Sequence, residues 1–153
     1  MKVEYINPFI VSSIDILKQV CNISVSKNQL FVKKGFTQLK DVTISVGVTG
    51  DIKGNFVMGF DRETAMNIAS IMMGGFPVTE FNEITASAVS EICNMIGGQS
   101  GIHFSDINTK IDITPPMMQI NREHATANYA NQTICVPLSL DIGGTLELDV
   151  CII

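Results

Sequence analysis

The sequence predicts an α+β fold in which helices pack on an antiparallel sheet, built from two pseudo-symmetric halves. Three observations predict it. Two stretches of alternating apolar residues each fold back at a glycine-containing turn, and apolar residues at helical spacing precede each of them. No linker or low-complexity segment divides the 153 residues. We therefore expect residues 1–153 to form a single domain around one core.

The first half begins with a helix at about residues 7–21. Asn7 is expected to be its N-cap, because Pro8 suits the first helical position. Alternating residues 42–48 and 56–60 then predict a hairpin around the turn residues 49–54. A short helix follows, which we expect Asp61 to cap and Gly74-Gly75 to end.

The second half repeats this plan. A long helix is predicted from about Thr79 to Phe104, and Thr114-Pro115-Pro116 favours extended chain after it. The last hairpin alternates from Val136 to Ile142, turns at Gly143-Gly144 and alternates again to Ile152. Hairpins this apolar need cover, and edge pairing with a second copy of the chain is one way to obtain it.

Composition excludes several classes of protein. With 46% hydrophobic and 16% charged residues, the chain is not a disordered one. A net charge of −5 argues against a nucleic-acid partner, which needs a cationic face. No apolar run reaches the roughly 18 residues of a membrane span, and the first residues do not resemble a signal peptide. The prediction is a cytoplasmic protein that does not associate with membranes.

Metal, nucleotide and nucleophile motifs are missing. The four cysteines are scattered without CxxC spacing, so we expect buried free thiols. His103 and His124 are the only histidines and do not have zinc-site spacing. The glycines form neither a Walker loop nor GxGxxG, and no Ser or Cys stands in a GxSxG-like elbow. We predict no metal site and no cofactor of the protein's own.

One candidate site remains, in the middle of the long helix. At ~100° per residue, Glu91 and Asn94 lie about 60° apart and point the same way. The opposite face is apolar, whereas Ser87, Ser90 and Gly98 leave the strip around the pair free of bulk. Apolar rims border this strip, Met95 and Ile84. A solvated helix face would show the same ExxN spacing, but Gly97-Gly98 costs the helix on the order of 1–2 kcal/mol, which suits close approach of a partner.

In these residues the chain resembles the CheC, CheX and FliY family of chemotaxis phosphatases. The resemblance spans nearly the whole chain, and its segments occur in the family's order. They are Glu4–Phe9, Gly50–Gly54, Ile71–Gly75, Ser87–Gly98 and Asp112–Pro116.

The resemblance implies hydrolysis of the aspartyl phosphate on a CheY-like receiver domain, in chemotaxis or related two-component signalling. It identifies Glu91 and Asn94 as the catalytic pair, with Ser87, Ser90, Met95 and Gly98 as docking residues around them. Mg²⁺ is expected on the partner receiver. Family members of the CheX type are homodimers, which implies the same here.

Two readings stay open beside the phosphatase. The same strip could belong to a non-catalytic interaction module that binds a signalling or flagellar-switch partner; a small-molecule sensor would need a pocket that the sequence does not indicate. Glu4 and Asn7 repeat the ExxN spacing of the site. Because Asn7 is expected to cap the helix and Glu4 to precede it, we do not expect them to form a second site.

Overall fold

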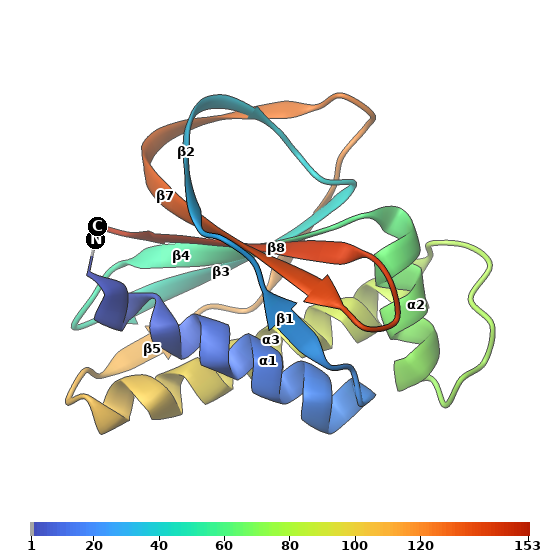
Figure 1. Cartoon of the computed structure of the whole chain (residues 1–153), viewed down its shortest axis with the longest axis horizontal. Helices are drawn as coiled ribbons and strands as arrows, with labels where there is room; N and C mark the ends of the chain where they lie inside the picture. The colour runs from blue at the N-terminus through green and yellow to red at the C-terminus, as the bar shows by residue number, and fades with distance from the viewer. Residues whose placement is uncertain (1) are drawn as a thin grey trace.

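The computed structural model describes residues 2–153, whose strands form one eight-stranded sheet with α1 and α3 packed on one face (Figure 1). The strand order is β1-β7-β8-β4-β3-β5, with β2 also paired to β7 and β6 to β3, and the pairs are antiparallel. The helices are η1 (Val3–Tyr5, a 3₁₀ turn), α1 (Asn7–Cys21), α2 (Arg62–Met72) and α3 (Glu83–Asp106). The strands are β1 (Val25–Lys27), β2 (Phe31–Gln38), β3 (Val42–Gly50), β4 (Gly54–Phe60), β5 (Ile111–Ile113), β6 (Met117–Ile120), β7 (Thr126–Leu140) and β8 (Thr145–Ile152). The predicted α+β class is confirmed.

The two predicted hairpins form the centre of this sheet. β3 and β4 make the first, β7 and β8 the second, and they join along β4 and β8, where Phe56 faces Val150 and Phe60 faces Leu146. Period-2 alternation produces this result, because every second residue of each strand faces the helices. An internal twofold symmetry between the halves stays a prediction.

Aromatic contacts fix the two long helices to the sheet. Phe9 of α1 lies 5.0 Å from Phe56 of β4 and 5.2 Å from Phe104 of α3, measured between ring centroids. All three side chains are fully buried. Their contacts set the position of α3, and with it the candidate site. Within residues 2–153, no helix has the length and apolar content that a membrane crossing requires.

The ends of two helices differ from the prediction. Asn7 is the first residue of α1 and does not cap it; Ile6 is the N-cap, and the cap makes no side-chain hydrogen bond. The 3₁₀ turn η1 leads directly into α1, so the chain enters the helix already coiled. α3 begins at Glu83, later than the predicted Thr79, because Asn82 caps it.

Asp61 occupies the N-cap position of α2, but its side chain does not cap the helix. Its carboxylate instead lies 3.4 Å from the Lys40 ammonium. Asp41, which lies just before β3, supplies the capping carboxylate instead. Its Oδ2 accepts a hydrogen bond from the Arg62 backbone N–H at 2.8 Å. The predicted end of α2 is confirmed, since Gly74 and Gly75 both have positive φ directly after it.

An unpredicted feature is the arm formed by β2 and the first half of β7, which rises above the face of the sheet opposite α1 and α3 (Figure 1). The pairing slips between Lys33 and Gly35, and Gly35 has a φ of +72°. A bulge of this kind increases local twist and bends the ribbon. Below it, Cys151 is half-buried, whereas the other three cysteines are buried as predicted.

Candidate functional site

The start of α3 is fixed by a capping box. Asn82 Oδ1 accepts hydrogen bonds from the backbone N–H groups of Ile84 and Thr85 at 3.0 and 3.1 Å, and the Thr85 hydroxyl accepts one from the Asn82 N–H at 3.5 Å. These bonds satisfy donors that a helix otherwise leaves unpaired. The helix therefore begins at a defined residue, which fixes the rotation of every side chain that follows.

The inner face of α3 is buried against the sheet and α1. Val89, Ile92, Cys93 and Ile96 are all 0% exposed. Gly97 continues this face: a Cβ added there would lie 2.7 Å from Ile113 Cδ1 and 3.6 Å from the Phe56 ring. Its missing side chain lets α3 approach β5 closely.

The outer face carries the predicted pair. Glu91 and Asn94 are both exposed on α3. The ion pairs among residues 2–153 involve other groups, and the side-chain hydrogen bonds that α3 itself makes come from its cap and from Ser100. A carboxylate and an amide thus point into solvent side by side, free to bind groups of another molecule.

A shallow groove runs beside the pair. Ser90, Glu91 and Asn94 form one wall, the segment Ile113–Pro116 forms the other, and the hollow measures about 420 Å³. Thr114 fixes this second wall to the sheet, because its N–H donates to the Gly47 carbonyl at 3.0 Å and its Oγ1 accepts from the Gly47 N–H at 2.8 Å. Pro115 and Pro116 have restricted φ, so the wall is stiff.

The sequence predicted Thr114-Pro115-Pro116 as extended chain but not as part of the site. Nothing in its local pattern says which helix it will border. Its position follows from the pairing of β5 and β6 with β3, which is a long-range property.

The predicted docking residues lie around the pair with different exposure. Ser87 and Gly98 are exposed, and nothing lies within 4 Å of a Cβ added at Gly98. Ser90 is half-buried in the groove wall. Met95 is half-buried too and packs against the core, so less of it reaches the rim than the sequence suggested. The docking role of all four stays a prediction.

Glu4 and Asn7 have a different geometry from the one expected. Glu4 lies in the 3₁₀ turn that continues into α1, and in such a turn residues three apart share a face. Glu4 precedes α1 as expected, but Asn7 is the first residue of the helix and not its cap, so that part of the argument against a second site is wrong. Their surroundings still differ from those of the α3 pair, because the Glu4 carboxylate lies 3.7 Å from the Lys2 ammonium.

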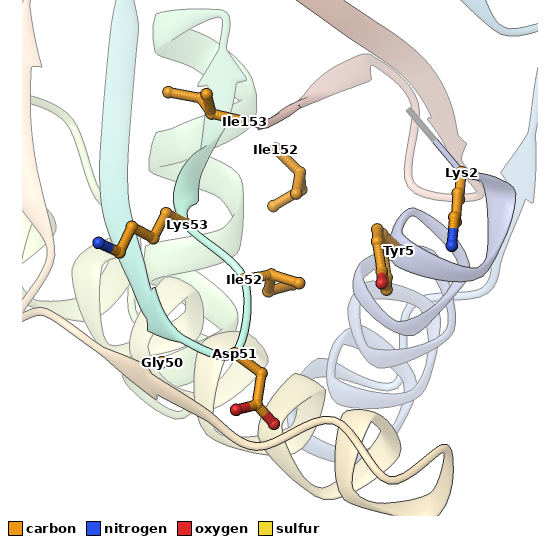
Figure 2. Close-up of a pocket in the computed structure, with 8 residues that line it drawn as sticks. All are labelled: Lys2, Tyr5, Gly50, Asp51, Ile52, Lys53, Ile152 and Ile153. Carbon is orange, nitrogen blue, oxygen red and sulfur yellow. The ribbon is translucent and has the colours of Figure 1, made fainter.

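A larger hollow, of about 540 Å³, lies at the turn between β3 and β4 (Figure 2). Ile52 and Ile152 point into the hollow, and Tyr5 of η1 lines it from the side on which α1 lies. The side chains of Asp51 and Lys53 point away from it. Asp51 Oδ2 accepts a hydrogen bond from the Lys110 N–H at 2.7 Å and so serves the turn. This hollow brings together no acid–amide pair like that of α3.

Three side chains of types that can bind a metal ion lie close together on the sheet. Ligand atoms of Cys135, Glu147 and Asp149 lie within 4.8 Å of one another. The Lys33 ammonium is already there, 2.7 Å from Glu147 and 2.9 Å from Asp149. Burial raises the pKa of the Cys135 thiol, which keeps its proton. The donor set therefore fits an internal ion pair better than a metal ion.

Residues 42–139 match the family "Chemotaxis phosphatase CheX". The chain belongs to this family. The matched segment contains α3 with Glu91 and Asn94, the facing wall and most of the sheet. The resemblance read from the sequence is confirmed.

Individual relatives agree. The CheY-P phosphatase CheX of Thermotoga maritima is 35% identical over 78 residues, 51% of this chain and 50% of that protein. The alignment thus spans about half the length of this curated relative.

Solved structures match over nearly the whole chain. A CheC-like superfamily protein from Shewanella sp. PV-4 has a TM-score of 0.88 at 27% identity, covering 100% of this chain and 99% of that one. CheX in a CheX–CheY–BeF₃–Mg²⁺ complex from Borrelia burgdorferi has a TM-score of 0.81 at 24% identity, covering 99% of both chains.

Proposed function

We propose that the protein hydrolyses the aspartyl phosphate of a CheY-like response regulator in chemotaxis or related two-component signalling. The observation that carries this is the unpaired acid–amide pair Glu91/Asn94, exposed on α3 beside a stiff groove inside the family match. The Thermotoga relative is named a CheY-P phosphatase, and the Borrelia relative was solved with CheY.

In this mechanism Asn94 positions the attacking water. An acyl phosphate is already reactive, and the receiver supplies Mg²⁺ and a lysine around the phosphoryl group. The remaining requirement is a water held in line with the scissile bond, which is a problem of orientation. The Asn94 amide accepts from the water through its oxygen and donates to a nearby oxygen through its nitrogen.

Glu91 has a separate task, anchoring the receiver. An ionised carboxylate has only acceptors, so it suits a lysine ammonium across the interface. Because Glu91 has no cationic neighbour on its own helix, it is free for this contact. Neither task requires a metal or a cofactor on the protein itself.

The protein is proposed to act in the cytoplasm as a homodimer. Phosphorylated receivers reside there, and the arm carries apolar side chains that a monomer leaves in water. They are Phe31 (45% exposed), Val32 (49%) and Phe36 (78%), with Leu30 (42%) directly before β2. A second copy placed on the arm would cover them.

The test is single-turnover decay of a phosphorylated CheY receiver, with binding measured separately on the receiver held active by BeF₃ and Mg²⁺. We expect Asn94→Ala to leave binding almost intact and to slow phosphate loss on the order of 10²-fold. Glu91→Ala should weaken binding as well as rate. Its effect should shrink at high salt, because an exposed ion pair is screened.

Two results would change the assignment. Near wild-type decay with both substitutions would remove this site from the reaction. Binding of the receiver by wild-type protein without any acceleration of its decay would favour the non-catalytic interaction module.

A further inference from the structure

Apart from its first and last residues, Glu83 and Asp106, the exposed residues of α3 form one straight strip that continues well past the Glu91/Asn94 pair. They are Ile84, Ser87, Glu91, Asn94, Gly98, Ile102 and Ser105. Their spacings of three and four residues keep them on one side of the helix. The half of the strip beyond Gly98 did not enter the site as read from the sequence.

An isoleucine stands at each end of this strip. Ile84 is 60% exposed and Ile102 is 58% exposed. Ile102 follows Ile84 by 18 residues, about five turns at 3.6 residues per turn, so the two side chains point in the same direction about 27 Å apart. Single exposed apolar residues are common, but these two lie in line on one helix face with the polar pair between them.

The residues between the isoleucines are small or uncharged except for Glu91. Ser87 and Gly98 present little bulk, and a Cβ at Gly98 would meet nothing within 4 Å. A flat partner surface can therefore reach both isoleucines while Glu91 and Asn94 enter the phosphorylation site between them.

We propose that Ile84 and Ile102 are paired apolar anchors for the phosphorylated receiver domain, and that they fix its orientation along α3. This rests on the function proposed above. A contact limited to Glu91 and Asn94 would be far smaller than the ~800 Å² per partner of a typical specific interface. A footprint spanning about 27 Å of helix approaches the diameter of a small domain and contributes much more of that area.

The experiment titrates a CheY receiver carrying BeF₃ and Mg²⁺ against wild type, Ile84→Ser, Ile102→Ser and Ile142→Ser. Ile142, 40% exposed in the turn between β7 and β8, is the control. We expect Ile84→Ser and Ile102→Ser each to weaken binding about tenfold, and Ile142→Ser to bind like wild type. Ile102→Leu should bind about as tightly as wild type, because it keeps the apolar contact.

The rate separates anchoring from catalysis. At saturating protein, the single-turnover rate of Ile102→Ser should stay within about twofold of wild type, since the pair is intact, whereas Asn94→Ala loses rate at saturation. Melting temperatures should be unchanged, because neither isoleucine is in the core.

The possible failures are distinct. If wild type accelerates decay but Ile102→Ser binds as tightly as Ile142→Ser, the anchors are wrong and the phosphatase stands. If wild type binds the receiver without accelerating decay, the proposed phosphatase activity is wrong. Weaker binding by Ile84→Ser and Ile102→Ser would then still support the anchors. If wild type does not bind the receiver, both proposals fall.

Discussion

Gly97 and Gly98 are neighbours in the middle of α3, yet they face opposite surroundings. Gly97 is buried where α3 meets β5, and an added methyl group would press on Ile113. Gly98 is on the outer strip in open space. The first glycine therefore serves packing, and the second keeps the outer surface of α3 low, where we propose that the receiver docks.

We predict that Gly98→Ala stabilises the protein and impairs its function. Replacing an exposed helical glycine by alanine gains about 1 kcal/mol of unfolding free energy, with no contact to offset it. The added methyl group stands one turn beyond Asn94, so kcat/KM on a phosphorylated receiver should fall.

Gly97→Ala is the matched control. The same helical gain is opposed by crowding against Ile113, so the variant should gain less stability than Gly98→Ala. Urea unfolding and the decay assay measure both. A Gly98→Ala protein that is more stable and fully active would show that this part of the strip does not touch the receiver.

Single residues also mark how far the sequence could predict the site. Helical periodicity alone predicts that Glu91 and Asn94 point outward together, and the structure confirms this placement. Their catalytic role follows from the family resemblance and stays a proposal. Asn7 is not the N-cap of α1, and Asp61 occupies the N-cap position of α2 without a side-chain capping bond, because capping depends on the path of the chain before the helix and on distant partners. The carboxylate that binds the start of α2 comes from Asp41, which lies just before β3 and 21 positions before Arg62.

At the scale of elements, the arm is held to the sheet by a buried charge network. Lys33 of β2 is 4% exposed and reaches past β7 to Glu147 and Asp149 of β8. Burial works to lower the pKa of Lys33, but the two carboxylates outweigh it and raise the pKa above its usual range. Burial also raises the pKa of Asp149, which Lys33 only partly offsets.

We predict that Lys33→Met destabilises the protein by about 3–5 kcal/mol at pH 7, because two carboxylates are left without a cation and Asp149 is buried. Without Lys33, the pKa of Asp149 in the folded state rises further above its ordinary 3.8. A carboxyl group with a raised folded-state pKa favours folding at low pH and loses that contribution as pH rises through the raised pKa. The deficit of Lys33→Met should therefore shrink as pH falls from 7 toward 4.

Lys34→Met, on the exposed neighbouring residue, is the control and should have little effect. Urea unfolding at several pH values measures the three proteins. Equal losses for both substitutions, or a deficit independent of pH, would contradict the role of the network.

The hairpins could be predicted from the sequence, whereas this arm could not. Apolar and polar residues alternate at positions 42–48, so the sequence itself indicates which face of the strand is buried. β2 contains two adjacent lysines and a glycine, which locally indicate a loop. Lys33 is buried only because carboxylates from residues more than a hundred positions away receive it.

At the scale of the whole molecule, two groups of exposed apolar residues lie on opposite sides of the sheet. The strip on α3 lies on the helical side of the sheet, and the arm rises from the other side (Figure 1). A dimer built through the arm would leave both copies of α3 free. The proposed dimer and the proposed receiver contact are therefore compatible.

The last prediction tests this assembly. We expect a solution mass near twice 16.6 kDa. Phe36→Ser should weaken the dimer about 10²-fold or more, because burying one phenylalanine contributes roughly 1.5–3 kcal/mol and a twofold interface contains it twice. Phe76→Ser is the matched control and should leave the dimer intact. Phe76 is 71% exposed and Phe36 78%, but Phe76 lies in the loop before α3, away from the arm. Light scattering over a dilution series should show Phe36→Ser dissociating first, and a monomeric wild type at tens of micromolar would refute the dimer.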